Sequence, residues 1–135
     1  MATFQKKLQI SIGSAFYFLI INLPQTYKLT NNILPWKTTQ NECPTYLGLF
    51  THTFVFFIIT FLTMRNSKLK MEIKLKHSLN GTLIFFMLSN PATYSLVAGL
   101  FGNKIAYNGC PKLTGVLLHT IIYCVFLLSV MYLPD

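Results

Sequence analysis

The stretch LTGVLLHTIIYCVFLLSVMYL, from Leu113 to Leu133, contains no charged residue and is long enough to cross a membrane. A bilayer core of about 30 Å requires roughly 20 residues of helix. Three further apolar stretches precede it, at residues 8–23, 46–64 and 79–101. We therefore expect an all-α integral membrane protein with four spanning helices.

The composition agrees with a lipid environment. Of the 135 residues, 53% are hydrophobic and only 10% are charged, whereas about 25% charged residues is ordinary for a soluble domain. Three acidic residues exclude most chemistry that needs paired carboxylates, so we expect no enzyme activity, no metal site and no cofactor. The net charge of +8 lies between apolar stretches and not over a soluble surface, so we expect no specific nucleic-acid partner.

The first apolar stretch also has features of a secretory signal peptide. Lys6 and Lys7 precede it, as the basic residues of a signal peptide precede its apolar region. No convincing cleavage site with two small residues follows. We therefore expect a helix that is retained in the mature protein.

Lysine and arginine are distributed unevenly between the two ends of the expected helices. Seven lie in the N-terminal segment and the 65–78 loop: Lys6, Lys7, Arg65, Lys68, Lys70, Lys74 and Lys76. Four lie on the other side: Lys28, Lys37, Lys104 and Lys112. The excess predicts that both termini and the 65–78 loop are cytosolic. The glycosylation sequon at Asn80 then lies near the cytosolic boundary and is expected to remain unmodified.

A shift of 67 residues aligns the chain with itself without a gap, and residues 1–68 match residues 68–135 at 16 of 68 positions. The matches cluster in motifs: Pro24-Gln25-Thr26-Tyr27 with Pro91-Ala92-Thr93-Tyr94, Asn41-Glu42-Cys43-Pro44 with Asn108-Gly109-Cys110-Pro111, and Gly48-x-x-x-His52-Thr53 with Gly115-x-x-x-His119-Thr120. Fixed spacing with matching residue types indicates an internal repeat. We interpret residues 1–135 as one membrane domain of two tandem helical hairpins, residues 1–67 and 68–135. Because each has an even number of helices, both insert in the same orientation, related by a pseudo-two-fold axis along the membrane normal.

The two repeated prolines predict kinks. Pro91 lies inside the third apolar stretch, so the first helix is expected to pass through Pro24 with a kink and continue toward Leu34. A proline is tolerated in a membrane helix when neighbouring groups satisfy the carbonyl that it frees. Asn22 and Asn90 lie close enough in sequence to do this.

Cys43 and Cys110 correspond in the repeat, and each precedes a proline that suits the first turn of the next helix. Two interpretations remain open: a disulfide that clamps the two hairpins, with Cα atoms about 4.4–6.8 Å apart, or two free thiols at loop ends. A quinone-linked redox enzyme would need a Cys-x-x-Cys pair, which is absent from the sequence. Cys124 is expected to fill a small apolar space in the fourth helix.

His52 and His119 lie at the same depth in the second and fourth apolar stretches. An ionisable residue inside a membrane is a functional candidate. One interpretation is that this intramembrane polar pair faces inward from both helices to bind a metal or relay a proton. However, two ligands do not make a zinc site. The alternative is a neutral imidazole that hydrogen-bonds a neighbouring helix. Its expected partners are a backbone carbonyl or the side chains of Tyr27, Tyr94, Thr26 and Thr93. Gly48 and Gly115, one turn away, would let another helix approach closely.

The segment from Lys68 to Lys76 alternates between charged and apolar residues. This period is typical of a strand, which would pair at its edge with another protein. The alternative is a helical extension of the third span, with lysines that reach anionic headgroups. In both cases the basic residues face a partner or lipid: Arg65, Lys68, Lys70, Lys74 and Lys76.

The pattern Asn-Pro-x-Thr-Tyr-x-Leu at residues 90–96, followed by Asn-Gly-Cys-Pro-x-x-x-Gly-x-x-x-His at residues 108–119, resembles small tandem-repeat membrane proteins of large double-stranded DNA viruses of the algal-virus and giant-virus kind. The first repeat departs from it at Leu23, in place of Asn, and at Glu42, in place of Gly. The resemblance implies no enzyme activity. It implies a minor capsid or virion membrane protein that links an internal bilayer, derived from a host membrane, to the shell.

Two classes of function follow from these observations. The first is a structural membrane protein of the virion, whose basic cytosolic face contacts capsid or other virion proteins, or anionic lipid. The second is a small oligomeric channel or transporter with the histidine pair in its path, although no carboxylate lies in a span to carry a proton. A membrane enzyme would need a nucleophile with its base, a metal cluster or a phosphate-binding loop, and none of these motifs occurs in the sequence. We expect the lipid bilayer and virion proteins as partners, with self-association as a further option.

Overall fold

The computed structural model describes residues 4–40, 43–65, 68, 70–102, 104–107 and 110–132. Asn41, Glu42, Asn108 and Gly109 of the repeated motif and Leu69 of the alternating segment lie outside the described residues. The described part contains six helices: α1 (Phe4–Asn22), α2 (Pro24–Ile33), α3 (Tyr46–Thr63), α4 (Met71–Ser89), α5 (Pro91–Phe101) and α6 (Leu113–Val130). It also contains two short antiparallel hairpins, β1 (Thr39–Gln40) with β2 (Cys43–Pro44) and β3 (Ala106–Tyr107) with β4 (Cys110–Pro111).

Four of the helices are long. The α1 and α4 helices have 19 residues each, and α3 and α6 have 18 each. At 1.5 Å per residue their lengths are about 27–28 Å, close to the thickness of a bilayer core. By length and composition, α3 and α6 are apolar enough to cross a membrane, and α4 with α5 forms a third candidate span if the bent pair is taken together.

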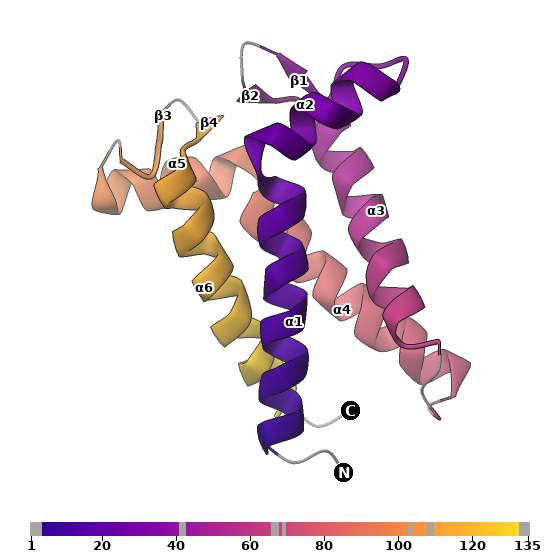
Figure 1. Cartoon of the computed structure of the whole chain (residues 1–135). Coiled ribbons are helices and arrows are strands. Elements are labelled where there is room, and N and C mark those ends of the chain that lie inside the picture. Colours follow the sequence, from indigo (N-terminus) through magenta and orange to yellow (C-terminus); the bar gives the residue numbers. More distant parts are fainter. Residues whose placement is uncertain are drawn as a thin grey trace.

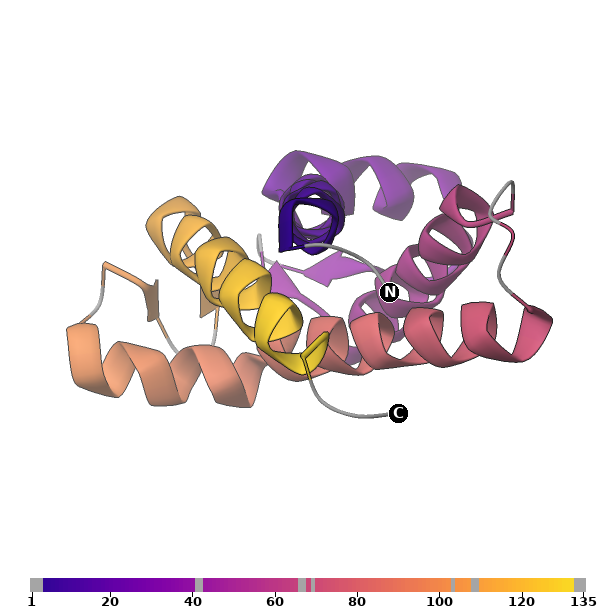
Figure 2. The same cartoon turned by 90° about the horizontal axis from the view of Figure 1, so that it is seen from below.

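The elements gather at two ends of the molecule. Figure 1 shows the four long helices running between these ends, with the hairpins, α2 and α5 at one end. The two chain termini and the connection between α3 and α4 lie at the other end. From below, α2 and α5 lie on opposite sides of the molecule (Figure 2). The N-terminal segment and the 65–78 segment therefore share one end, as the charge distribution predicts.

The most extensive helix contacts form between α1 and α6 and between α3 and α4. A shift of 67 residues converts α1 into α4 and α3 into α6, so these two contacts are the same contact made twice. We call two residues that are 67 apart offset counterparts. Several residues contact their own counterparts, and other contacts recur with the two halves exchanged, as expected near an approximate two-fold axis.

An aromatic cluster occupies the core between the four long helices. Phe18, Phe56, Phe85 and Tyr123 are each 0% exposed. Phe18 lies 5.4 Å from its counterpart Phe85, and Phe56 lies 5.8 Å from its counterpart Tyr123, measured between ring centroids. Stacked contacts at 4.9 Å (Phe18–Tyr123) and 4.5 Å (Phe56–Phe85) complete the cluster, and such ring pairs stabilise a core beyond their buried area. Cys124 is half-buried and packs against this cluster.

The outer faces of the long helices are apolar. Phe16 and its counterpart Leu83 are 59% and 60% exposed, and Phe54 and its counterpart Ile121 are 65% and 63% exposed. Large apolar side chains exposed on every long helix mark a surface that contacts something other than water. The same outward positions are apolar in both halves of the chain.

Both prolines interrupt the chain more sharply than a kink within one helix. The α1 helix ends at Asn22, Leu23 adopts an extended conformation, and α2 begins at Pro24. In the second half Asn90 is extended before Pro91, and α5 is turned by 56° from α4. A residue before proline avoids the helical region because of a steric clash, so the predicted continuous helix toward Leu34 is replaced by a break and a second helix.

Two local expectations from the sequence are wrong. Residues 71–76 are the first turns of α4, so the strand interpretation of the alternating segment fails there and the helical extension holds from Met71 onward. Pro44 and Pro111 do not lie in a first helical turn, because they belong to β2 and β4. The α3 helix begins instead at an N-cap, where the Thr45 hydroxyl accepts a 2.9 Å hydrogen bond from the Gly48 amide.

Candidate functional site: two buried histidine pockets

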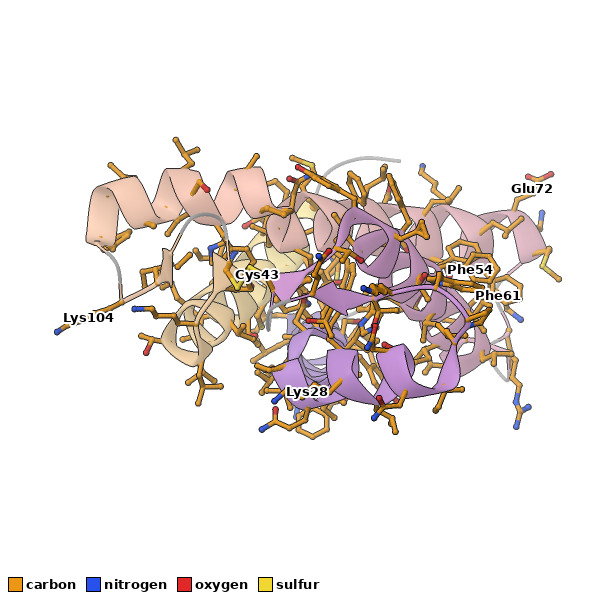
Figure 3. The ribbon with its side chains drawn as sticks, turned by 90° about the horizontal axis from the view of Figure 1, so that it is seen from above. Lys28, Cys43, Phe54, Phe61, Glu72 and Lys104 are labelled. Atoms are coloured by element: carbon orange, nitrogen blue, oxygen red, sulfur yellow. A yellow bond between two sulfur atoms is a disulfide. The ribbon has the colours of Figure 1, made fainter. Side chains whose placement is uncertain are left out.

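We call the end of the molecule that carries the two β-hairpins the hairpin end. There a disulfide joins Cys43 of the first hairpin to Cys110 of the second, and their Cα atoms lie 5.2 Å apart. These residues are offset counterparts, so the bond lies on the approximate two-fold axis. Figure 3 shows Cys43 where the hairpins of the two halves meet. Of the two interpretations that the sequence left open, the structure contains the clamp.

Each hairpin folds back over a glycine of the helix that follows it. The Thr45 amide donates to the Thr38 carbonyl at 3.0 Å, and the counterpart Lys112 amide donates to the Ile105 carbonyl at 3.0 Å. A Cβ atom at Gly48 would overlap the Thr38 carbonyl, and one at Gly115 would overlap the Ile105 carbonyl. The two glycines therefore admit the hairpin backbone, and not another helix as the sequence had indicated.

In each half, the threonine of the Pro-x-Thr motif donates to a carbonyl that the proline leaves without its helical partner. Pro24 has no amide hydrogen for the Ile20 carbonyl, and the Thr26 hydroxyl donates to that carbonyl instead. Thr93 donates in the same way to the Met87 carbonyl, four residues before Pro91. The predicted role of the asparagines is wrong. Asn22 donates to the Phe18 carbonyl at 2.9 Å, and the Asn90 carboxamide oxygen accepts from the Ala92 amide at 3.0 Å.

The two histidines satisfy the next orphan carbonyl along each broken helix. The His52 Nδ1 atom lies 2.9 Å from the Ile21 carbonyl oxygen, and the His119 Nδ1 atom lies 2.8 Å from the Leu88 carbonyl oxygen. Because a carbonyl only accepts, Nδ1 carries the hydrogen in both rings, and in a neutral ring Nε2 is left as the acceptor. The last four carbonyls of a helix lack partners within it, so each histidine caps a helix end inside the molecule.

The tyrosine of each repeated motif covers the histidine ring. Tyr27 stacks on His52 with 3.8 Å between centroids and 12° between planes, and Tyr94 stacks on His119 at 3.9 Å and 2°. All four side chains are at most 3% exposed. Tyr27 and Tyr94 are therefore partners of the histidines through ring stacking, whereas Thr26 and Thr93, also expected as partners, bond to backbone carbonyls.

The two pockets differ at the other ring nitrogen. In pocket one (Tyr27, Thr30, Thr38 and His52) the Thr30 hydroxyl lies 2.9 Å from the His52 Nε2 atom and 2.9 Å from the Thr38 hydroxyl. The Thr38 hydroxyl has two acceptors for its single hydrogen, the Thr30 oxygen and the Tyr27 carbonyl 2.8 Å away. The side chains of pocket one thus form a connected polar network around the imidazole.

In pocket two (Tyr94, Val97, Ile105 and His119) both threonines are replaced by apolar counterparts, Val97 and Ile105. The His119 Nε2 atom and the Tyr94 hydroxyl are buried and have no hydrogen-bond partner. An unsatisfied buried polar atom costs about 1–3 kcal/mol. Pocket two therefore keeps the helix cap and the ring stack but not the polar network.

The arrangement holds helix ends and hairpins together. Within the described residues there is no group of three or more histidine, cysteine or carboxylate side chains that could hold a metal ion. Beside Tyr27, a hollow of about 20 Å³ is large enough for one water molecule but not for an organic substrate. Each histidine bonds within its own half, so the two rings do not act as a facing pair.

The opposite end of the molecule carries the basic segment. Arg65, Lys68, Lys70 and Lys76 are exposed, and the half-buried Lys74 donates to the Arg65 carbonyl at 3.3 Å, across the connection between α3 and α4. The Lys7 ammonium lies 4.0 Å from the centre of the Tyr132 ring, which ties the two ends of the chain together. This end is thus positively charged and includes both chain termini (Figure 1).

Sequence reasoning missed Thr30 and Thr38 as members of pocket one. The signal used was identity between offset counterparts, and neither threonine has an identical counterpart. Comparison of the chain with protein-family models, with curated proteins and with solved structures finds no match.

Proposed function

We propose that the protein is a structural integral membrane protein in which α1, α3, α4 and α6 cross the bilayer. The observation that carries this proposal is the matched apolar exterior of the four long helices. Phe16, Phe54, Leu83 and Ile121 are all more than half exposed, as lipid-facing side chains are. Each of these helices has a length of about 27–28 Å, which suits the hydrocarbon core.

The broken helices support the same proposal. Inside a bilayer every backbone polar group needs a partner from the protein itself. The carbonyls freed by Pro24 and Pro91 receive threonine hydroxyls, and the next carbonyls receive histidine rings. A soluble protein would satisfy such groups with water, whereas this chain dedicates four buried or half-buried side chains to them.

We further propose that the basic end lies in the cytosol and binds an anionic partner. Seven of the eleven lysine and arginine residues lie in the two segments at this end. Excess positive charge keeps a segment on the cytosolic side, and it also attracts anionic lipid headgroups or acidic protein surfaces. Both termini are cytosolic in this orientation, and the hairpins face the opposite compartment.

The resemblance to membrane proteins of large double-stranded DNA viruses extends the proposal to a virion. In that setting the protein is a minor capsid or virion membrane component of an internal membrane derived from the host. Its basic end faces the shell and links the bilayer to capsid proteins. A structural role of this kind needs no catalytic group and no cofactor.

The alternative function is a small oligomeric channel or transporter. It would require His52 and His119 to line a path for ions or protons. Both Nδ1 atoms are bonded to carbonyls, and His52 also uses its Nε2 atom. These bonds favour the structural role over the alternative.

A charge-neutralisation experiment tests the partner of the basic end. The triple variant Lys68→Gln, Lys70→Gln, Lys76→Gln is compared with the matched triple variant Lys37→Gln, Lys104→Gln, Lys112→Gln at the hairpin end. Each protein is reconstituted in neutral phosphatidylcholine vesicles and mixed with vesicles that contain phosphatidylserine. Loss of three positive charges at the basic end is expected to lower vesicle capture at least tenfold, whereas the hairpin-end variant retains it.

Three outcomes contradict the proposal. Equal capture by both triple variants would show that the basic end has no special role. Ion flux through the reconstituted wild-type protein, abolished by the double change His52→Phe and His119→Phe, would favour the channel. Glycan attachment at Asn80 in a microsomal insertion assay would reverse the proposed orientation.

A further inference from the structure

The two short helices that follow the prolines need a separate explanation. We propose that α2 and α5 do not cross the bilayer but lie in the interface of a single leaflet, on the hairpin side, with their exposed apolar side chains among the lipid acyl chains near the headgroups. This inference rests on the proposed membrane location of the protein. It assigns the two helices a lipid-binding surface.

Helix lengths leave little of the bilayer core for α2 and α5 to cross. The α1 and α4 helices each contain 19 residues before the proline that follows them, about 28 Å of helix. Their first turns carry lysines, Lys6 and Lys7 in α1 and Lys74 and Lys76 in α4, whose side chains extend to the headgroups, so each helix covers most of the hydrocarbon core before the proline. The 56° turn between α4 and α5 then directs α5 away from the axis of the span.

The exposed faces of the two helices are apolar at corresponding positions. On α2, Leu29 is 58% exposed and Ile33 is 69% exposed, and these residues lie one turn apart. Their counterparts on α5, Leu96 and Leu100, are 71% and 79% exposed. The inner face of each helix buries a single residue, the tyrosine that stacks on the histidine. Two helices that bury so little against the protein and expose so much apolar area fit a lipid interface.

The polar residues of α2 distinguish the interface from the bilayer core. Gln25, Lys28 and Asn32 are exposed beside the apolar ridge, and a lysine in the centre of a bilayer costs several kcal/mol. At the interface these side chains reach the headgroups, while Leu29 and Ile33 remain in lipid. Tyr27 stacks on His52 and Tyr94 stacks on His119 in the same way. Because these equivalent stacks hold the two helices, α5 lies at the same depth as α2 although it has fewer polar residues.

A tryptophan and two lysines at this end also suit the interface between membrane and water. Trp36, which is the sole tryptophan of the chain and follows α2, is 40% exposed, with its indole nitrogen 2.9 Å from the Thr51 hydroxyl. Tryptophan is enriched where a membrane meets water. Lys28 and Lys104 lie at the periphery of this end in Figure 3, where their charges suit lipid phosphates. The occupant of the apolar faces is therefore lipid.

Depth-dependent fluorescence quenching tests the inference on the full chain. In a Trp36→Phe background, three single changes introduce one tryptophan each: Leu29→Trp on α2, Leu96→Trp on α5 and Phe54→Trp in the middle of α3. Each variant is reconstituted in vesicles whose lipids carry bromine either close to the headgroup or deep in the acyl chain. Formation of the Cys43–Cys110 disulfide, seen on a non-reducing gel, checks that each variant has folded.

The expected result is a division between the short helices and the span. The Leu29→Trp and Leu96→Trp proteins lose more fluorescence with shallow bromine, and the Phe54→Trp protein loses more with deep bromine. Equal depth of Leu96→Trp and Phe54→Trp would show that α5 continues a bent span and would overturn the inference. Quenching of Phe54→Trp without quenching of the other two would place α2 and α5 in water, which also overturns it. If Phe54→Trp were not quenched at either depth, the proposed membrane location itself would fail.

Discussion

Pocket one and pocket two perform the same structural task with different chemistry. In both, a histidine caps the helix end before a proline, and a tyrosine covers its ring at 3.8 or 3.9 Å. In pocket one Thr30 and Thr38 complete a polar network, while in pocket two Val97 and Ile105 leave the His119 Nε2 atom without a partner. The two halves thus share the histidine cap and the ring stack, whereas only the first half has the hydroxyl network.

The largest expected effect tests what the two pockets share. Gly48→Ala and Gly115→Ala each place a Cβ atom against a hairpin carbonyl, so each is expected to lower the free energy of unfolding by about 3 kcal/mol. Unfolding in mixed micelles with increasing sodium dodecyl sulfate, followed by circular dichroism, measures this loss. Gly13→Ala is the matched control, because no atom lies within 4 Å of its added Cβ. A large difference between the two pocket variants would break the symmetry of the comparison.

The histidines themselves separate the two pockets. His52→Leu removes bonds to the Ile21 carbonyl and to Thr30, and is expected to cost about 3 kcal/mol. His119→Leu removes one bond and also removes an unsatisfied nitrogen, so the expected cost is about 1 kcal/mol. The same micelle titration compares them. Equal losses would mean that the bond between Thr30 and His52 contributes nothing to stability.

Exchange of one side chain between the pockets sharpens the comparison further. Thr30→Val leaves the His52 Nε2 atom without a donor and is expected to cost about 1 kcal/mol. The reverse change, Val97→Thr, supplies a donor to the His119 Nε2 atom and is expected to stabilise the protein by about 1 kcal/mol. The gain from Val97→Thr should vanish in a His119→Leu background. A gain that persists there would have another origin.

The smallest expected effect concerns the hydroxyl caps, which are the same in both halves. Thr26→Val and Thr93→Val each remove the hydroxyl that donates to a carbonyl freed by proline, and each is expected to cost about 0.7 kcal/mol. The Ile20 carbonyl keeps a second, longer hydrogen bond of 3.3 Å from the Leu23 amide. Thr120→Val is the control, because the Thr120 hydroxyl donates to the Val116 carbonyl, which lies inside the continuous helix α6. If the control costs as much as the caps, the proline breaks do not depend on them.

Much of the site was predictable because its residues recur at corresponding positions in the two halves of the sequence. The 67-residue offset identified Pro24, Tyr27, Cys43, Gly48 and His52 with their counterparts, and the structure brings these residues together at one end. Side-chain identity at fixed spacing is a strong signal, since two halves under the same packing constraints retain the same residue types. The α3 and α6 helices were predictable for a simpler reason, which is their uninterrupted apolar sequence.

The atoms that the histidines bind were not predictable from residue types. The carbonyls of Ile21 and Leu88 belong to the backbone, which looks the same at every residue, and only the break at the proline leaves them without partners. Thr30 and Thr38 escaped notice because their counterparts are Val97 and Ile105. A search for differences between the halves, once the histidines were identified, would have found them.

The course of the chain after each proline was also beyond the sequence pattern. An apolar run from residue 79 to residue 101 reads as one span, although Asn90 takes the extended conformation that Pro91 imposes and the chain turns by 56°. Likewise, the alternation near Lys70 has the period of a strand, yet α4 begins at Met71. A short alternating segment is compatible with a helix end whose lysines extend toward water.

The bond between Cys43 and Cys110 makes the chain a ring with two tails. The ring runs from β2 through α3, α4, α5 and β4, and the tails are α1 with α2 on one side and α6 on the other. A protease cut between α3 and α4 opens the ring without releasing either half, and reduction of the disulfide alone does the same. Only the two together break every covalent connection between the halves, each of which then carries one histidine pocket, one broken helix and one cysteine released from the disulfide. The same disulfide, formed between two chains instead of within one, would join a symmetric dimer in which each chain has the length of one half of this protein.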